Sequence, residues 1–307
     1  MQLFLIAGPT ASGKTALALR LAQAIGGEIV NADALQVYRD LRILSARPSP
    51  EEESLVPHHL FGVADASEAC SVGRWLAAAK PVLNDIAARG KAAVVVGGTG
   101  LYFRALTEGL AQLPAVPAEV RREVGERFDR IGEAAFRLEL AAVDPAAETR
   151  ISQGDWQRLA RALEVHAATG RALSDWQSDA APAFARDYQA VALEPPRDEL
   201  YARCDARFVA MVQAGALGEV RELLGRGLDP ALPAMKAVGV RELGGHLSGE
   251  LDLAEAIALG QQQTRRYAKR QLTWLRNQTP DWPRIDATDA DGQWRQFLAL
   301  NPALTLC

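Results

Sequence analysis

Short apolar runs bordered by glycine or aspartate alternate with amphipathic stretches in the first third of the chain. The runs Leu3–Ala7, Glu28–Asp33 and Ala92–Gly98 are short and aliphatic, which predicts buried strands. Between them, Thr15–Ile25 and Val72–Arg89 repeat their apolar positions with the period of a helix. This alternation predicts an α/β fold in which helices cover both faces of a parallel sheet.

A fourth apolar run, Tyr188–Pro195, comes only after a long stretch of a different kind. Between about Pro117 and Ser178 strand signals are absent, and the amphipathic pattern predicts an inserted all-helical domain. After the fourth run the chain is again helical to about Gln278, and the Pro, Asp and Gly beyond it predict a less ordered tail. The expected division is 1–115 for the first part of the core, 116–182 for the insertion and 183–307 for the second part of the core.

The composition supports a folded core and argues against several classes of protein. Hydrophobic residues make up 49% of the 307, and a net charge of −4 argues against a generally basic surface. The three cysteines, Cys70, Cys204 and Cys307, are too far apart to indicate a disulfide framework or a cysteine zinc site. His58 and His59 lack a carboxylate or cysteine at ligand spacing, which favours a structural or surface role over metal binding.

The apolar run at the start of the chain is shorter than a signal peptide or a membrane span. We therefore expect a cytoplasmic protein that does not contact a membrane. No obligate protein partner is evident in the sequence.

A glycine-rich segment joins the first predicted strand to the first predicted helix. It reads Gly8, Pro9, Thr10, Ala11, Ser12, Gly13, Lys14, Thr15 and fits the P-loop pattern G-x-x-x-x-G-K-[ST]. Such a loop holds phosphate with backbone N–H groups and the helix dipole, and it offers Lys14 to the outer phosphates and the Thr15 hydroxyl to Mg²⁺. A glycine turn that merely begins a helix is the alternative. The agreement of both flanking elements favours a P-loop NTPase-like core.

The acidic residue that a nucleotide hydrolase places at a later strand end is absent after Gly97 and Gly98. The nearest acid at a strand end is Asp33, which we expect to face the same crevice as the P-loop. A carboxylate there is a candidate general base, and the alternative is the N-cap of the next helix. Thr99, in the segment GGTGLY, is a candidate hydroxyl near the phosphate.

A long segment near the end of the chain is basic. No acidic residue occurs from Ala256 to Pro280, and one predicted helix there carries Arg265, Arg266, Lys269, Arg270 and Arg276. Leu272 and Leu275 are available for burial, and Trp274 is available for packing or stacking. Because no acidic partner within the protein is expected for these five cations, their clustering on one helix predicts contact with a phosphate backbone. A solvated charged face is the alternative, although it would usually include glutamates.

A second basic patch lies in the predicted insertion. It contains Arg121, Arg122, Arg158 and Arg161. Acidic residues surround these arginines, so the patch is ambiguous by itself.

Together these motifs resemble those of the tRNA dimethylallyltransferases, also called tRNA isopentenyltransferases. The matching segments are GPTASGKT at 8–15, DALQVY at 33–38, GGTGLY at 97–102, DWQRLARALE at 155–164, AVGVRE at 237–242 and TRRYAKRQLTWLR at 264–276. They span nearly the whole chain. Trp156 stands where proline or another residue is common, and Val240 stands where an aromatic is usual, so no base stacking is expected at Val240. The cysteine and histidine pairs of a zinc-finger extension are missing, which indicates the bacterial type.

The resemblance implies transfer of a dimethylallyl group from dimethylallyl diphosphate to N6 of the adenosine just 3′ of the anticodon, with release of diphosphate. It implies that residues 8–15 and Arg207 hold the diphosphate, and that Thr15 binds Mg²⁺. It also implies catalytic roles for Asp33, Thr99 and Lys14. Asp33 would accept the proton of the attacking amino group, which is a weak nucleophile.

The resemblance further implies which residues contact the anticodon stem-loop of tRNA. They are Asp33, Ala34, Leu35, Gln36, Thr99, Arg121, Gln157, Arg158, Leu159, Ala160, Arg161, Lys236, Ala237, Val238, Gly239, Val240, Arg241, Lys269, Arg270, Gln271, Leu272, Thr273, Trp274, Leu275 and Arg276. The target base would have to be flipped out of its stack to reach Asp33.

Three other functions share part of this pattern. A small-molecule P-loop kinase has the same loop and sheet but has no use for a basic helix. An adenylate isopentenyltransferase uses the same donor with a free nucleotide as acceptor. A nucleic-acid-binding switch NTPase would need the missing acidic strand end.

Overall fold

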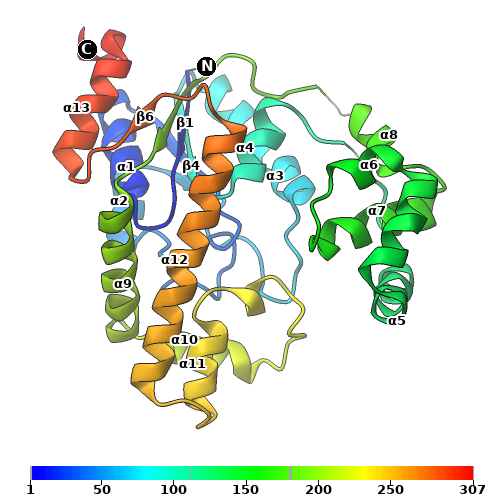
Figure 1. The fold of residues 1–307 in the computed structure, drawn as a ribbon. Coiled ribbons are helices and arrows are strands. Elements are labelled where there is room, and N and C mark those ends of the chain that lie inside the picture. Colours follow the sequence, from blue (N-terminus) through cyan, green and yellow to red (C-terminus); the bar gives the residue numbers. More distant parts are fainter. Residues whose placement is uncertain (1, 112, 180–181, 307) are drawn as a thin grey trace. The chain divides into compact units, whose positions relative to one another are not determined.

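The computed structural model describes residues 2–111, 113–179 and 182–306, so Cys307 lies outside the described residues. The chain forms two compact units (Figure 1). The larger unit comprises Met1–Ala105 and Ala185–Cys307, and the smaller unit comprises Leu106–Phe184. Among the described helices, none combines the length and the apolar character that crossing a membrane requires.

A six-stranded sheet with parallel pairing throughout forms the centre of the larger unit. Its strands are β1 (Leu3–Ala7), β2 (Glu28–Asn31), β3 (His58–His59), β4 (Ala93–Gly97), β5 (Gln189–Leu193) and β6 (Arg284–Ile285). Their order across the sheet is β3-β2-β4-β1-β5-β6. The four strands predicted from apolar runs are confirmed as β1, β2, β4 and β5. The edge strands β3 and β6 have two residues each, which is too short to give a periodic pattern.

Helices cover the sheet of the larger unit. They are α1 (Lys14–Ile25), α2 (Pro50–Leu55), α3 (Val72–Ala88), α4 (Gly100–Thr107), α9 (Arg197–Gln213), α10 (Ala216–Gly225), α11 (Val240–Leu247), α12 (Leu253–Gln278) and α13 (Ala290–Leu300), with 3-10 helices at Ala234–Lys236 and Pro302–Leu306. Figure 1 shows α1 and α13 on one side of the sheet and α3 and α4 on the other. The expected covering of both faces is therefore confirmed.

The tail beyond Gln278 is not the irregular segment that its composition predicts. It forms β6, which pairs with β5, and α13, which packs against α1. Phe297 of α13 is buried with its ring centroid 6.3 Å from that of Phe4 in β1. The prediction was wrong because contacts with β5 and α1, far away in the sequence, stabilise these elements.

The smaller unit is all-helical in its regular structure, as the pattern predicts. Its helices are α5 (Ala118–Val143), α6 (Pro145–Arg150), α7 (Trp156–Thr169) and α8 (Leu173–Ser178), while Leu106 and Thr107 belong to the end of α4. Phe136, Leu140 and Leu159 have no exposed surface and form its core. The buried carboxylate of Asp144 accepts hydrogen bonds from Ala147 N at 2.9 Å and Ser174 N at 2.9 Å, which joins α6 to α8.

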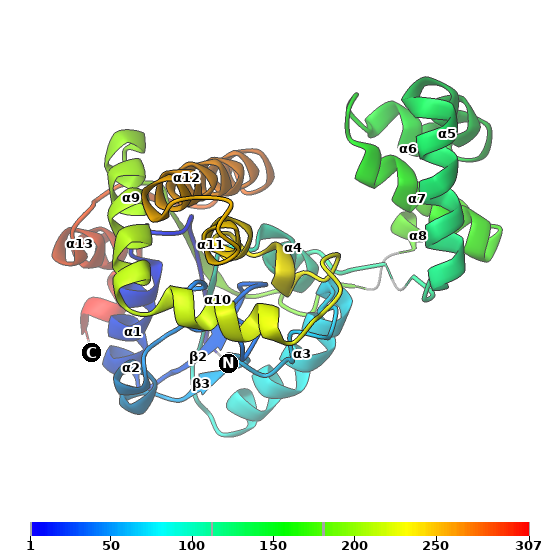
Figure 2. The ribbon, with the colours of Figure 1, turned by 90° about the horizontal axis from the view of Figure 1, so that it is seen from below.

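Two long helices, α9 and α12, lie side by side in the larger unit (Figures 1 and 2). A small apolar cluster joins them to the P-loop: Ala11 packs with Leu200 and Cys204 of α9 and with Ala268 and Leu272 of α12. The predicted basic helix is therefore part of the wall behind the P-loop.

The histidine pair has a structural role at the edge of the sheet. His59 Nε2 lies 2.8 Å from Oε2 of the buried Glu28 in β2, and Arg89 contacts both oxygens of the same carboxylate. The hydrogen bonds from Arg89 lower the pKa of Glu28 from 4.5 to about 2. His58 packs against Phe61 with ring centroids 5.4 Å apart.

We expect Glu28→Gln to lower the free energy of unfolding at pH 7 by about 2 kcal/mol, because it removes charge-assisted hydrogen bonds. The pKa of Glu28 is lowered in the folded protein, so its contribution is complete above pH 4.5 and is lost as the pH falls toward 2. Urea unfolding of both proteins at pH 7 and pH 3 should show a smaller difference at pH 3. Glu222→Gln, at an exposed position, should match the wild type, and a pH-independent loss in Glu28→Gln would contradict the linkage.

Candidate active site

A pocket in the larger unit collects residues from five parts of the chain. They are Thr10, Lys14 and Thr15 of the P-loop; Asp33, Leu35, Gln36, Leu44, Ser45 and Ala46 after β2; Arg207, Phe208 and Met211 of α9; Val238; and Thr264 and Tyr267 of α12. The parallel register explains this meeting, since Ala7 pairs with Gly97 and Asn31 pairs with Val96, so the carboxyl ends of β1, β2 and β4 share one edge. The expectation that Asp33 faces the P-loop crevice is confirmed.

The P-loop has the backbone of an anion site. Gly13 has φ 96° and Ala11 has φ 64°, both in the left-handed region that L side chains rarely adopt. The N–H groups of Ala11 and Gly13 have no acceptor among the described residues, and the first N–H groups of α1 are free in any helix. Behind the loop, Gln293 Nε2 donates to Ser12 O at 2.8 Å. A Cβ at Gly13 would lie 2.7 Å from Gln293 Oε1, so glycine is required there.

Two cations in this pocket are poorly compensated. Lys14 is buried, and among the described residues its Nζ donates only to Pro9 O, at 3.3 Å. Burial lowers the pKa of Lys14 from 10.5 to about 8, although the charge of Asp33 partly opposes this effect. Burial also lowers the pKa of Arg207, which makes no hydrogen bond or ion pair with residues in the described ranges. A bound anion with several charges would satisfy both groups.

Asp33 is buried, but it does not cap a helix. Its Oδ1 accepts from Leu35 N at 3.0 Å in a turn, and the next helix begins only at Pro50. The buried Asn31 side chain fixes the backbone of Asp33: its Oδ1 accepts from Asp33 N at 2.8 Å, and its Nδ2 donates to Asp33 O at 3.0 Å. No described residue donates to Asp33 Oδ2. The N-cap alternative is therefore wrong, and one carboxylate oxygen remains available as a proton acceptor.

Thr99 supports the segment that follows Asp33. Its Oγ1 accepts from Ala34 N at 2.9 Å, and Thr99 itself does not line the pocket. The Thr99 hydroxyl thus contacts the segment beside the candidate base, and its role near the phosphate stays a prediction.

The glycines around Thr99 accommodate α12. A Cβ at Gly98 would overlap Gln271 Nε2, and a Cβ at Gly100 would overlap the indole of Trp274. The sequence predicted a close approach at these glycines. The group that approaches them is the basic helix.

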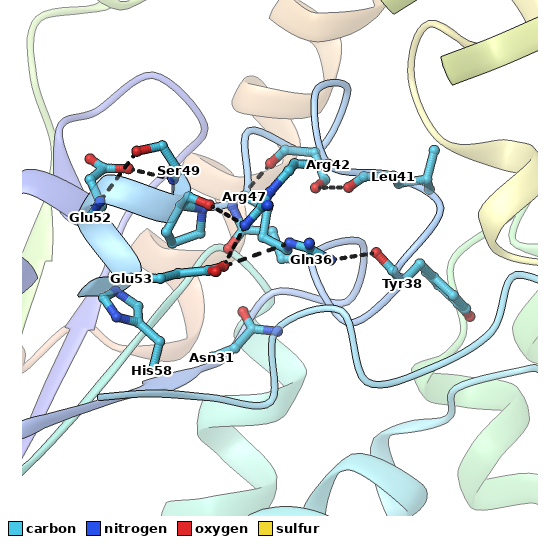
Figure 3. A network of polar contacts seen from close by, with 12 residues as sticks. Asn31, Gln36, Tyr38, Leu41, Arg42, Arg47, Ser49, Glu52, Glu53 and His58 are labelled. Carbon is cyan, nitrogen blue, oxygen red and sulfur yellow. Dashed lines mark hydrogen bonds and ion pairs between the residues drawn. The ribbon is translucent and has the colours of Figure 1, made fainter. Parts of the chain in front are cut away.

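A loop between β2 and α2 forms another wall of the pocket. Figure 3 shows polar contacts made by this loop. Gln36 Nε2 donates to Ser45 O at 3.0 Å and to Ala46 O at 2.9 Å. Three consecutive N–H groups of this loop donate to the carboxylate of Glu219 in α10; they belong to Arg42, Ile43 and Leu44. Figure 3 also shows the Arg42 side chain directed toward Glu53. Arg42 Nη2 donates to Glu53 Oε1 at 2.8 Å. Sequence reasoning missed Glu219, since nothing near it in the chain indicates its partners.

The basic face of α12 is less uniform than its composition indicates. Arg265 forms an ion pair with Asp205 of α9, and Arg276 Nε lies 2.7 Å from Oε1 of Glu194. The expectation that these cations have no internal partner was therefore wrong at two positions, because the carboxylates come from distant segments. Arg266, Lys269 and Arg270 are exposed.

The other residues that the resemblance assigns to tRNA differ in exposure. Exposed ones are Arg121, Gln157, Arg158, Lys236, Arg241 and Thr273, and half-buried ones are Ala34, Leu35, Arg161, Val238 and Trp274. Buried ones are Gln36, Leu159, Ala160, Ala237, Gly239, Val240, Gln271, Leu272 and Leu275. Leu159 and Ala160 belong to the core of the smaller unit, while Leu272 packs on Ala11. The buried side chains thus contact protein rather than solvent.

The chain has a parallel sheet in which a P-loop joins β1 to α1, and this arrangement defines the class of P-loop NTPase-like α/β proteins. Residues 36–278 match the family described as IPP transferase, and residues 1–56 match that described as isopentenyl transferase. A tRNA dimethylallyltransferase of Phenylobacterium zucineum (strain HLK1) is 64% identical over 304 residues, 99% of each chain. That of Caulobacter sp. (strain K31) is 57% identical over 97% of this chain and 96% of its own.

Solved structures agree with these sequence matches. The full-length tRNA isopentenylpyrophosphate transferase of Bacillus halodurans is 32% identical with a TM-score of 0.69, covering 99% of this chain and 96% of that one. A eukaryotic dimethylallyltransferase acting on tRNA is 26% identical with a TM-score of 0.82, covering 100% and 80%. The chain belongs to the family of tRNA dimethylallyltransferases, which are prenyl-transferring enzymes.

The lowered pKa of Lys14 predicts a pH-dependent affinity for inorganic diphosphate. Anion binding favours protonated Lys14, so affinity should fall about tenfold between pH 7 and pH 9 as the free lysine loses its proton around its pKa of about 8. Isothermal titration calorimetry measures the diphosphate affinity of the wild type and of Lys14→Met at each pH. The ratio of the two affinities isolates the effect of Lys14 protonation, because the titration of diphosphate itself affects both proteins equally. A ratio that stays constant with pH would contradict the assignment.

Proposed function

We propose that this chain transfers the dimethylallyl group of dimethylallyl diphosphate to N6 of the adenosine just 3′ of the anticodon in tRNA. The observation that carries the proposal is the shared pocket, in which Lys14 and Arg207 accompany the buried carboxylate of Asp33. Such a pocket suits a reaction that releases a polyanion and needs a proton acceptor nearby. The tRNA dimethylallyltransferases to which the chain is similar support the transferred group and the acceptor.

The donor diphosphate would occupy the P-loop. Its oxygens would accept from the free N–H groups of Ala11 and Gly13, while Lys14 and Arg207 would offset the negative charge that develops as the allylic C–O bond breaks. Arg207 suits this contact because its planar guanidinium binds two oxygens at once. The diphosphate leaves with the electrons of that bond.

Prenyl transfer from a diphosphate generally requires a divalent metal, and the residues present fit Mg²⁺. The half-buried Thr15 lines the pocket with a hard oxygen donor beside the P-loop. Mg²⁺ commonly keeps several waters and binds through substrate phosphates, and the Thr15 hydroxyl would add one protein ligand to these. The ion would neutralise charge on the leaving group.

Asp33 would act on the acceptor. The adenine amino group gains the C–N bond and must lose a proton, which Asp33 Oδ2 would accept. Asn31 and Thr99 hold the segment around Asp33, so the carboxylate is positioned before the substrate arrives.

The RNA would contact exposed residues of both units. In the larger unit these are Lys236, Arg241, Arg266, Lys269, Arg270, Thr273 and Arg276, and in the smaller unit Arg121, Gln157 and Arg158. We propose that the helical insertion, expected at residues 116–182, binds the anticodon stem-loop. Buried residues such as Leu272 would act by keeping the helices in place.

Adenylate isopentenyltransferase activity and small-molecule kinase activity are the competing functions. Incubation with labelled dimethylallyl diphosphate and either unmodified tRNA or AMP, followed by mass analysis of nucleosides, distinguishes the two acceptors. We expect label on one adenosine of tRNA and none on AMP. Phosphorylation of a small molecule by ATP would contradict the proposal.

Asp33→Asn should reduce the single-turnover transfer rate by about 10² to 10⁴, the usual contribution of a positioned base. The amide oxygen can still accept from Leu35 N, so folding should be retained. The rates are compared at saturating substrates, because loss of the Asp33 charge also changes the electrostatic environment of Lys14. Asp229→Asn is a matched control, since Asp229 accepts from Ala231 N in a similar turn but is exposed. A transfer rate near that of the wild type in Asp33→Asn would remove Asp33 from the mechanism.

Lys269→Ala and Arg270→Ala should weaken tRNA binding and make the plot of log affinity against log salt shallower. The expected change is about 0.7 to 0.9 for each lost phosphate contact. Lys91→Ala is the control, because Lys91 is exposed before β4, at the opposite edge of the sheet from the pocket. Filter binding at several salt concentrations measures the slopes, and equal slopes in all four proteins would contradict an RNA role for this face.

A further inference from the structure

Gln271 of α12 joins the loops at two strand ends. Its Oε1 accepts from Thr10 N in the P-loop at 2.8 Å, and its Nε2 donates to Gly98 O after β4 at 3.0 Å. The residue is only 6% exposed. Its amide is therefore engaged inside the protein, whereas an RNA contact would need it at the surface.

The loop that Gln271 holds continues to the candidate base. Gly98 is followed by Thr99, whose Oγ1 accepts from Ala34 N at 2.9 Å, directly beside Asp33. Because β4 lies between β1 and β2 in the sheet, the loop after β4 begins between the strands that lead to the P-loop and to Asp33. Hydrogen bonds through Gln271 and Thr99 thus connect the diphosphate side of the pocket with the proton-acceptor side.

The packing of α12 places the Gln271 side chain against the P-loop. Ala268 and Leu272, three residues before and one residue after it, belong to the apolar cluster on Ala11. A Cβ at Gly98 would overlap Gln271 Nε2. The absence of a side chain at Gly98 thus leaves the space that the Gln271 amide occupies.

We infer that Gln271 is a positioning residue, which sets the distance between the P-loop and Asp33 through Thr10 and Gly98, and that it is not an RNA contact. The inference rests on the proposed function. Transfer requires the allylic carbon to lie between the leaving oxygen and the attacking nitrogen, and a displacement of about 1 Å in such a geometry can cost on the order of 100-fold in rate. Loss of the Gln271 amide should therefore affect the chemical step more than either affinity.

Two variants separate the contacts of Gln271. Gln271→Met has a similar length without hydrogen bonds, and Gln271→Glu can accept from Thr10 N but cannot donate to Gly98 O. We expect single-turnover rates at saturating substrates to fall about 10- to 100-fold in both variants. In Gln271→Met, which adds no charge beside the P-loop, dissociation constants for inorganic diphosphate and for tRNA should stay within about threefold of the wild type. Gln278→Met, the same change at an exposed position of α12, should behave as the wild type.

A double-mutant cycle with Asp33→Asn tests the route of the effect. If Gln271 acts by positioning Asp33, Gln271→Met should cost less in the Asp33→Asn background than in the wild type. Equal costs in the two backgrounds would overturn the inference. So would weaker tRNA binding with a normal rate at saturation, which indicates an RNA contact, or loss of folding in both variants, which indicates a purely structural role. The wild type is assayed first, so absence of transfer there tests the proposed function separately.

Discussion

Parallel pairing of β1, β4 and β2 is the constraint on which the site depends. It brings the carboxyl ends of the three strands to one edge of the sheet. Lys14 and Asp33 line one pocket at this edge, and the loop that begins at Gly98 follows the third strand. No single helix or loop could place these groups together. The candidate base Asp33 follows a different strand from the P-loop, because β4 lies between β1 and β2 in the sheet.

The charges within the pocket are arranged for a polyanion. Lys14 and Arg207 are removed from water without a full set of partners, which disfavours their charged forms, and the lowered pKa of each expresses that cost. Asp33 offsets part of the cost for Lys14 by its charge. A bound diphosphate would supply partners for both cations, which is consistent with the proposed donor.

The helix α12 serves two sides of the molecule. Its inner face carries Gln271 and Leu272, which contact the P-loop, and its outer face carries the exposed Lys269 and Arg270. The close approach of α12 explains the glycines at 98 and 100, where a Cβ would overlap the side chains of Gln271 and Trp274. The basic composition of the segment thus describes only one of its two faces.

The sequence alone determined the elements whose signal is local. The strands β1, β2, β4 and β5, the P-loop and the position of Asp33 after a strand follow from short-range patterns, because burial and backbone conformation there repeat over a few residues. The tertiary structure decided the rest: the order of α13, the ion pairs of Arg265 and Arg276, and the inward direction of Gln271. Each of these depends on partners that are distant along the chain. Neither the period of a segment nor its composition encodes which distant group will lie against it, and only the packing of α9, α12 and α13 around the sheet supplies that information.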